Sequence, residues 1–135
     1  MSEFLVGIDL GTSNSAVAYI DRSKGPDAPV LDFPIVQTIR PSDVRPQALL
    51  PSALYLQHPG ELSAEAYALP WDPVPSQIVG EFARWQGSKV PSRLITSTKS
   101  WLSHGAVDRT APILPWGAPP DIGKMSPVDP EQKSR

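Results

Sequence analysis

The chain has 135 residues, 40% of them hydrophobic and 19% charged, which is the composition of a folded domain and not of a disordered polar segment. Its 17 prolines exclude a bundle of long helices or a coiled coil, because proline breaks helix interiors. A formal net charge of -2 argues against a nucleic-acid module that binds by phosphate neutralisation, and the lack of cysteine excludes disulfides and thiolate metal sites.

Four extended segments are expected in the first half of the chain. Phe4–Leu10 is apolar, Gly11–Ser13 is a turn signal and Ser15–Ile20 is apolar again, so these three predict a β-hairpin. Val30–Ile39 and Leu49–Leu56 predict two further strands. The start lacks the basic region of a signal peptide, and no segment is apolar over the length of a membrane span, so we expect a cytoplasmic protein.

Two short helices and two irregular segments are expected in the second half. Prolines forbid a continuous helix over Glu61–Ser76, which we interpret as an insertion loop. The pattern predicts a short helix over Gly80–Gln86 that Gly87 ends, and a longer helix over Ser92–His104. No periodicity follows, so we expect residues 105–135 to be an extended, proline-rich segment without core residues.

Several kinds of site are excluded by the residues present. Two histidines and no cysteine leave too few of the usual ligands for a zinc site. The interval from Gly117 to Gly123 is one residue too long for a Walker loop, and Met125 stands where that loop needs Ser or Thr. The chain also lacks a Gly-x-Ser-x-Gly nucleophile elbow and a dinucleotide-binding fingerprint.

One segment, Gly7–Ser15 (GIDLGTSNS), combines the groups that bind a metal-bound phosphate. A carboxylate, Asp9, ends an apolar strand and is followed by Gly11 and by the hydroxyls of Thr12 and Ser13. Glycine permits close backbone approach, successive turn N–H groups can face an anion, and a carboxylate can hold Mg²⁺ directly or through water. From these residues alone, a plain hairpin with Asp9 as a turn carboxylate is an equally good interpretation.

This segment resembles the first phosphate-binding motif of the actin-like ATPase superfamily and, within it, of the DnaK-type (70-kDa heat-shock) chaperone family. Three later segments resemble that family in the same order. Leu50–Tyr55 (LPSALY) is similar to its Thr-Pro-Ser strand, Ile78–Gln86 to its Val-Gly-x-x-Ala-x-x-Gln helix, and Ile95–Leu102 to the helix with an essential lysine. The resemblance covers about residues 3–104, and the segment after Gly105 looks more like a divergent bacterial branch.

The resemblance implies a role for each matching residue. Asp9 would organise the Mg²⁺ shell and take part in hydrolysis of ATP. The phosphate loop would consist of Gly11, Thr12, Ser13 and Asn14. Lys99 would be catalytic, because positive charge at the terminal phosphate stabilises phosphoryl transfer. From the residues alone, Lys99 has a second interpretation, as a surface lysine whose stem packs on an apolar stripe.

For the chain as a whole, the resemblance implies an α/β fold: part of an actin-like, ribonuclease-H-like ATPase lobe with a hairpin-led mixed sheet and two short helices. Residues 1–104 would belong to the nucleotide-binding domain, and residues 105–135 to a divergent or truncated region. The hairpin would lie at the centre of the lobe, with Asp9 and the loop at one open end. The implied function is the N-terminal portion of an ATP-binding chaperone whose full-length parent binds unfolded polypeptides and co-chaperones.

The family's second phosphate loop, adenosine-binding segment and hinge helices have no counterpart in these 135 residues. We therefore expect a fragment that is inactive alone, with neither nucleic acid nor a membrane as a partner. Two alternatives stay open: a fragment of a sugar or metabolite kinase of the same superfamily, and a non-enzymatic remnant. The Pro-Ser strand together with the lysine helix argues against the kinase.

Overall fold

The computed structural model describes residues 3–128, and these form a mixed α/β fold, as expected. The strands are β1 (Phe4–Leu10), β2 (Asn14–Asp21), β3 (Val30–Asp32), β4 (Ile35–Arg40), β5 (Asp43–Gln47), β6 (Leu50–Pro51), β7 (Ala53–Tyr55), β8 (Ile78–Val79) and β9 (Leu94–Thr96). The helices are α1 (Ala64–Tyr67), α2 (Gly80–Lys89) and α3 (Thr98–Leu102), with 3-10 turns over Arg22–Lys24 and Pro91–Arg93. Over this range, no helix has the length and apolar character needed to cross a bilayer.

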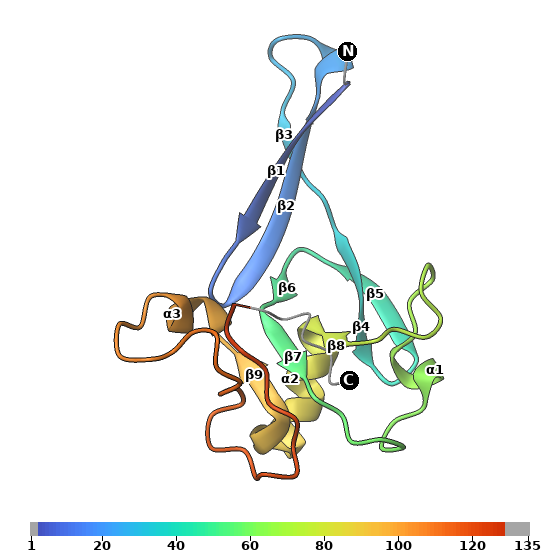
Figure 1. Ribbon diagram of the computed structural model, residues 1–135. Helices are drawn as coiled ribbons and strands as arrows, with labels where there is room; N and C mark the ends of the chain where they lie inside the picture. Colours follow the sequence, from blue (N-terminus) through green and yellow to red (C-terminus); the bar gives the residue numbers. More distant parts are fainter. Residues whose placement is uncertain (1–2, 129–135) are drawn as a thin grey trace.

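Strands β1 and β2 form the hairpin that the sequence predicts. They pair in antiparallel register from Phe4 with Asp21 to Leu10 with Ser15. Figure 1 shows the hairpin as an arm with its turn at the body of the molecule and its strand ends at the far tip. The expectation of a central position is wrong, because β3 and β6 both pair with β2 and leave β1 as an exposed edge strand.

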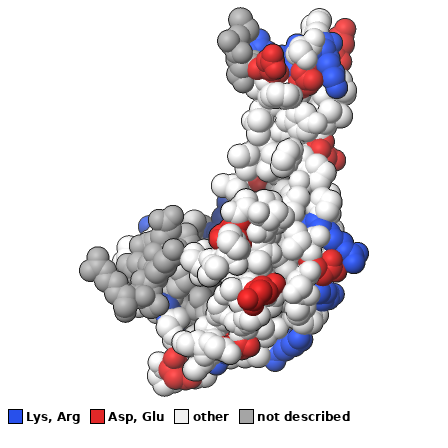
Figure 2. Space-filling view, turned by 90° about the vertical axis from the view of Figure 1, so that its right-hand side faces the viewer, with Lys and Arg blue, Asp and Glu red and all other residues white. Residues whose placement is uncertain are grey.

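The surface of the hairpin arm is largely uncharged. Figure 2 shows uncharged atoms along most of the arm and charged side chains gathered at its tip. Exposed apolar side chains account for this, and in β1 their exposed fractions run from 48% at Phe4 to 66% at Leu10. Contiguous exposed apolar surface is a common feature of interaction sites and of aggregation-prone surfaces.

Two of the predicted strands are each divided in two. The extended segment Val30–Ile39 is interrupted at Phe33 and Pro34, so that β3 joins the hairpin sheet whereas β4 pairs with β5. The segment Leu49–Leu56 is interrupted at Ser52, where the chain leaves β6 beside β2 and enters β7 between β8 and β9. The hairpin sheet and the body are therefore joined through these two interruptions.

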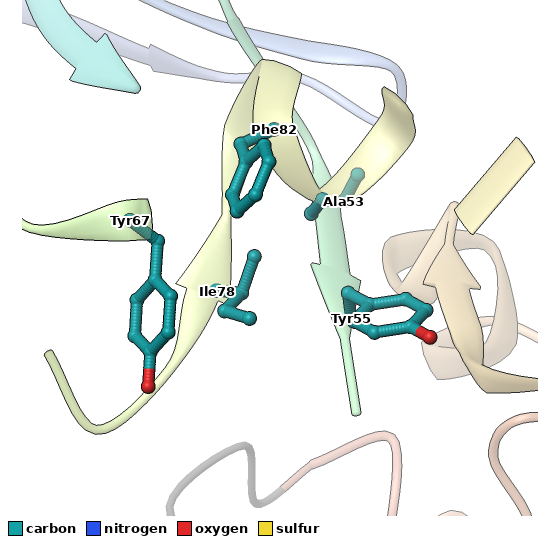
Figure 3. Close-up of a cluster of buried hydrophobic side chains, with 6 residues drawn as sticks. Ala53, Tyr55, Tyr67, Ile78 and Phe82 are labelled. Carbon is teal, nitrogen blue, oxygen red and sulfur yellow. The ribbon is translucent and has the colours of Figure 1, made fainter. Parts of the chain in front are cut away.

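The main hydrophobic core lies where α2 packs against β7 and β8 (Figure 3). It consists of the buried side chains of Ala53, Tyr55, Tyr67, Ile78, Phe82 and Ala83. The segment expected to be only an insertion loop thus forms α1 and contributes Tyr67 to this core.

The helix predicted over Gly80–Gln86 is present, but Gly87 does not end it, because α2 continues to Lys89. A Cβ at Gly87 would lie 2.6 Å from the Leu94 side chain, so glycine here permits close packing of α2 on β9.

The prediction of one helix over Ser92–His104 is wrong. Residues Leu94–Thr96 form β9, which pairs with β7 through Leu54 and Ile95, and only Thr98–Leu102 is helical. Pairing with β7 satisfies the backbone of β9 and buries the Ile95 side chain. Ser97, with a φ of 53°, then turns the chain into α3. The apolar spacing that resembled one helix belongs to two different elements.

The segment after Gly105 has no regular helix or strand up to residue 128, but it does contribute core residues. Leu114 and Met125 exchange backbone hydrogen bonds of 3.0 and 2.8 Å and are buried in a second cluster with Ile95. The expectation of a segment without core residues is therefore wrong for this part. The remainder of the expected tail, residues 129–135, lies outside the described residues.

A polar network around Glu61 joins the segment before α1 to α2 and to the 3-10 turn before β9. The Glu61 carboxylate accepts hydrogen bonds from Tyr55 Oη (2.6 Å), Gln86 Nε2 (3.1 Å), Arg93 Nη1 (2.8 Å) and the His58 amide (2.9 Å). Burial by itself raises the pKa of Glu61, but the donors together outweigh burial and hold that pKa below its ordinary value. The ionised Glu61 therefore stabilises the 3-10 turn that leads into β9.

The Glu61→Gln variant should lower the free energy of unfolding at neutral pH by about 1 to 2 kcal/mol, because four donors lose a charged acceptor. The pKa of Glu61 is lower in the folded than in the unfolded chain. Its contribution is therefore fully present above the unfolded pKa of about 4.3 and is lost as the pH falls through the folded pKa. Urea unfolding at a series of pH values measures this, with the exposed Glu3→Gln variant as control. Equal pH dependence in the two variants would refute the role of Glu61.

Candidate functional site

The turn between β1 and β2, residues Gly11–Ser13, is held against the body by Ser52. The Ser52 hydroxyl donates a hydrogen bond to the Gly11 carbonyl (2.8 Å), and the Ser52 amide donates one to the Ser13 carbonyl (2.9 Å). Pairing of β6 with β2 brings Ser52 to this position, since Pro51 lies opposite Asn14. A single residue thus binds the turn at its first and last positions.

Gly11 is required by the close approach of the two sides of the turn. A Cβ built on Gly11 would overlap the Asn14 carbonyl oxygen, which is a backbone atom and cannot move aside by a rotamer change. From the sequence, this glycine is expected to permit close approach of a ligand. The structure shows that glycine is needed here even without a ligand, because the turn closes too tightly for a side chain at this position.

Lys99 reaches the same turn from a distant part of the sequence. Its ammonium Nζ donates a hydrogen bond to the Leu10 carbonyl oxygen (2.7 Å), across 89 positions of the chain. Helix α3 carries Lys99, and the positive φ of Ser97 sets the direction in which α3 leaves β9. An ammonium has three donors, so one bond to Leu10 leaves two for an anion at the turn.

The other residues of the predicted site lie at the same end of the hairpin. Asp9 is exposed one residue before the end of β1, where it pairs with Ala16 of β2. Thr12 and Ser13 are exposed in the turn, and Asn14 begins β2. The structure therefore brings the predicted loop, Asp9 and Lys99 to one end of the hairpin, while their functional roles stay predictions.

A magnesium ion at this turn would have one protein carboxylate close to it in sequence, that of Asp9. Between residues 3 and 128, no group of three His, Asp or Glu side chains gathers into a metal site. Mg²⁺ usually keeps several waters and is held by one or two carboxylates together with substrate phosphates. An exposed carboxylate beside a tightly held turn fits a metal that is bound mainly through the phosphates.

An open depression borders the candidate site at Asn14. Its volume is about 640 Å³, and its lining includes Asn14, Pro51, Arg40 and Arg84 but neither Asp9 nor Lys99. Arg84 is neutralised there by the Glu81 carboxylate at 2.7 Å. The depression does not match the predicted nucleotide site, because neither Thr12 nor Ser13 lines it.

Ser52 is the residue of this site that the sequence analysis missed. The sequence predicts one continuous strand over Leu49–Leu56, whereas in the structure Ser52 follows the end of β6 and holds the turn. The signal in the sequence is a lone hydroxyl residue after proline between two apolar pairs. Such a pattern also fits a strand with one polar face, which is why it does not identify the contact.

Comparisons with protein-family models, with curated proteins and with solved structures find no match to this chain. The likeness to DnaK-type chaperones therefore depends on the four sequence segments. Two of those segments carry Ser52 and Lys99, which form hydrogen bonds to the Gly11 and Leu10 carbonyl groups.

The Gly11→Ala variant should disturb the turn, whereas Gly7→Ala in the same strand should not. At Gly7 the nearest atom to an added Cβ is the Ala18 carbonyl oxygen at 3.9 Å, an ordinary contact. We expect Gly11→Ala to lower the free energy of unfolding by about 1 to 3 kcal/mol, the usual cost of overpacking. Amide NMR signals of Thr12, Ser13 and Ser52 should shift in this variant alone. Matching spectra for the two variants would show that the turn accommodates a side chain.

Proposed function

We propose that this chain forms the first phosphate-binding side of the ATP site of a DnaK-type chaperone, in an actin-like, ribonuclease-H-like lobe. The hydrogen bond from Lys99 to the Leu10 carbonyl carries the proposal. The resemblance assigns two distant segments to the same phosphates, and the tips of these segments are in contact. A lysine that only covered apolar surface would have no need to reach this carbonyl.

Each group of the site would have its own task in binding and hydrolysis. The N–H groups of the turn and the hydroxyls of Thr12 and Ser13 would bind phosphate oxygens. Asp9 would hold Mg²⁺ through its waters, and the ion would neutralise phosphate charge. Lys99 would place positive charge beside the terminal phosphate, where negative charge shifts during phosphoryl transfer.

The wider function follows from the resemblance and belongs to a longer protein that contains this chain. There, ATP hydrolysis would be coupled to the binding of unfolded polypeptides, with co-chaperones as further partners, in the cytoplasm. We assign none of the described residues to the adenosine. The chain by itself should therefore bind the phosphates weakly and should not turn ATP over.

Mg·ATP should shift the amide NMR signals of Gly11–Asn14 in the 135-residue chain, and AMP at the same concentration should shift them much less, because the contacts are to the phosphates. The Gly11→Ala variant should lose most of this response. Phosphate release should stay at the uncatalysed rate, since phosphoryl transfer needs several preorganised groups. Unchanged loop signals at millimolar Mg·ATP would overturn the proposal. Turnover that Asp9→Ala abolishes would show that the chain holds more of the enzyme than we assign to it.

In a longer protein that contains this chain and hydrolyses ATP, Lys99→Ala should lower the hydrolysis rate by roughly 10²-fold and leave nucleotide binding largely in place. The matched control is Lys89→Ala, an exposed lysine whose Nζ lies 3.3 Å from the centre of the Trp85 ring. Single-turnover hydrolysis and calorimetric binding separate the two effects. Equal hydrolysis by the two variants would return Lys99 to a surface role.

A further inference from the structure

We infer that Ser52 is a positioning residue, which holds the Gly11 and Ser13 carbonyl groups towards the body so that the N–H groups of Thr12 and Asn14 face outward to an anion. The orientation of the turn follows from contacts in the structure. The identity of the anion as a nucleotide phosphate rests on the proposed function. Ser52 would act through the turn and would not touch the ligand.

The geometry of the peptide bond sets the direction of the N–H groups in the turn. The peptide bonds of the turn are trans, and in a planar trans peptide the C=O and N–H groups point in opposite directions. The Gly11 carbonyl faces the Ser52 hydroxyl at 2.8 Å, so the N–H of Thr12, in the same peptide, points away from Ser52. The Ser13 carbonyl faces the Ser52 amide at 2.9 Å, so the N–H of Asn14 also points away.

The outward side of the turn is exposed to solvent and open to a ligand. Thr12 and Ser13 are exposed, and within residues 3–128 the N–H of Thr12 has no backbone acceptor. Backbone N–H groups on the outward side of a turn, such as those of Thr12 and Asn14, can bind an anion. The hydroxyls of Thr12 and Ser13 add two donors to the same turn. The arrangement fits the phosphate groups of a nucleotide or a free phosphate, which share this chemistry.

The position of Ser52 makes these contacts a fixed feature of the fold. On one side Pro51 is buried and pairs with the hairpin, and on the other side Ala53 is buried in the main core. Pro51 has no N–H, so the amide of Ser52 is the first backbone donor after Leu50 that can bind the turn. Ser52 is thus anchored by the core and presents both of its donors to the hairpin.

The experiment compares Ser52→Thr, which keeps the hydroxyl, with Ser52→Val, which has nearly the same shape and lacks it. The matched control is Ser92→Ala, a half-buried serine away from the turn. Backbone NMR relaxation of Thr12 and Ser13 is measured in the free 135-residue chain, and binding is measured with Mg·ATP and with inorganic pyrophosphate. Signals of Tyr55 and Phe82 report whether the core of each variant is intact.

We expect Ser52→Val to raise the mobility of Thr12, because the Gly11 peptide loses its hydrogen bond. The binding affinity for both ligands should fall about five- to ten-fold. Ser52→Thr and Ser92→Ala should behave as the parent chain. A Ser52→Val variant with an intact core and an equally rigid turn would overturn the role of Ser52. A turn that becomes mobile in a chain that binds neither ligand would support the positioning role and overturn the proposed function.

Discussion

The segment Pro51–Ala53 connects the candidate site to the hydrophobic core. Ser52 binds the turn at both ends, and the next residue enters β7, which lies between β8 and β9 and packs on α2. The same strand also positions Lys99, because Leu54 pairs with Ile95 just before the chain turns into α3. The two contacts that reach the turn therefore share one support, and a change in the packing of β7 would move both of them.

The sequence predicts elements well where the partner of each residue is near in the chain. Strands β1 and β2 and their turn follow from a local pattern, and so does the start of α2. Prediction from the sequence fails where a residue distant in the chain determines the local structure. Leu94–Thr96 has apolar residues at a spacing typical of a helix, but pairing with β7, about 40 positions earlier, makes it a strand. Gly87 signals a helix end, yet Leu94 needs the space that glycine leaves inside α2.

The candidate site also contains residues that a local motif predicts and residues that depend on distant contacts. The residues Asp9–Asn14 form a continuous motif, so their shared position at one end of the hairpin could be predicted. Lys99 could be predicted only through the resemblance, because its partner lies 89 positions away. The local pattern around Ser52 does not identify its role, since Ser52 acts through a contact with Gly11, 41 positions earlier. Outside the site, Glu61 likewise acts through a contact with Arg93, 32 positions later. Side-chain contacts of this range become visible only when the fold is known.

The positions of the site residues depend on the contacts of the turn more than on the stability of the β1–β2 hairpin. The hairpin exposes apolar side chains along its length, and ring contacts from Phe4 to Tyr19 and from Tyr19 to Phe33 cover little of it. Only the short strands β3 and β6 pair with this hairpin, and a hairpin without further packing has marginal stability in water. Its turn, in contrast, is bound by Ser52 and by Lys99, both supported by the body. Asp9 lies two residues from Gly11, so the contacts of the turn fix its position relative to the loop, whatever covers the arm.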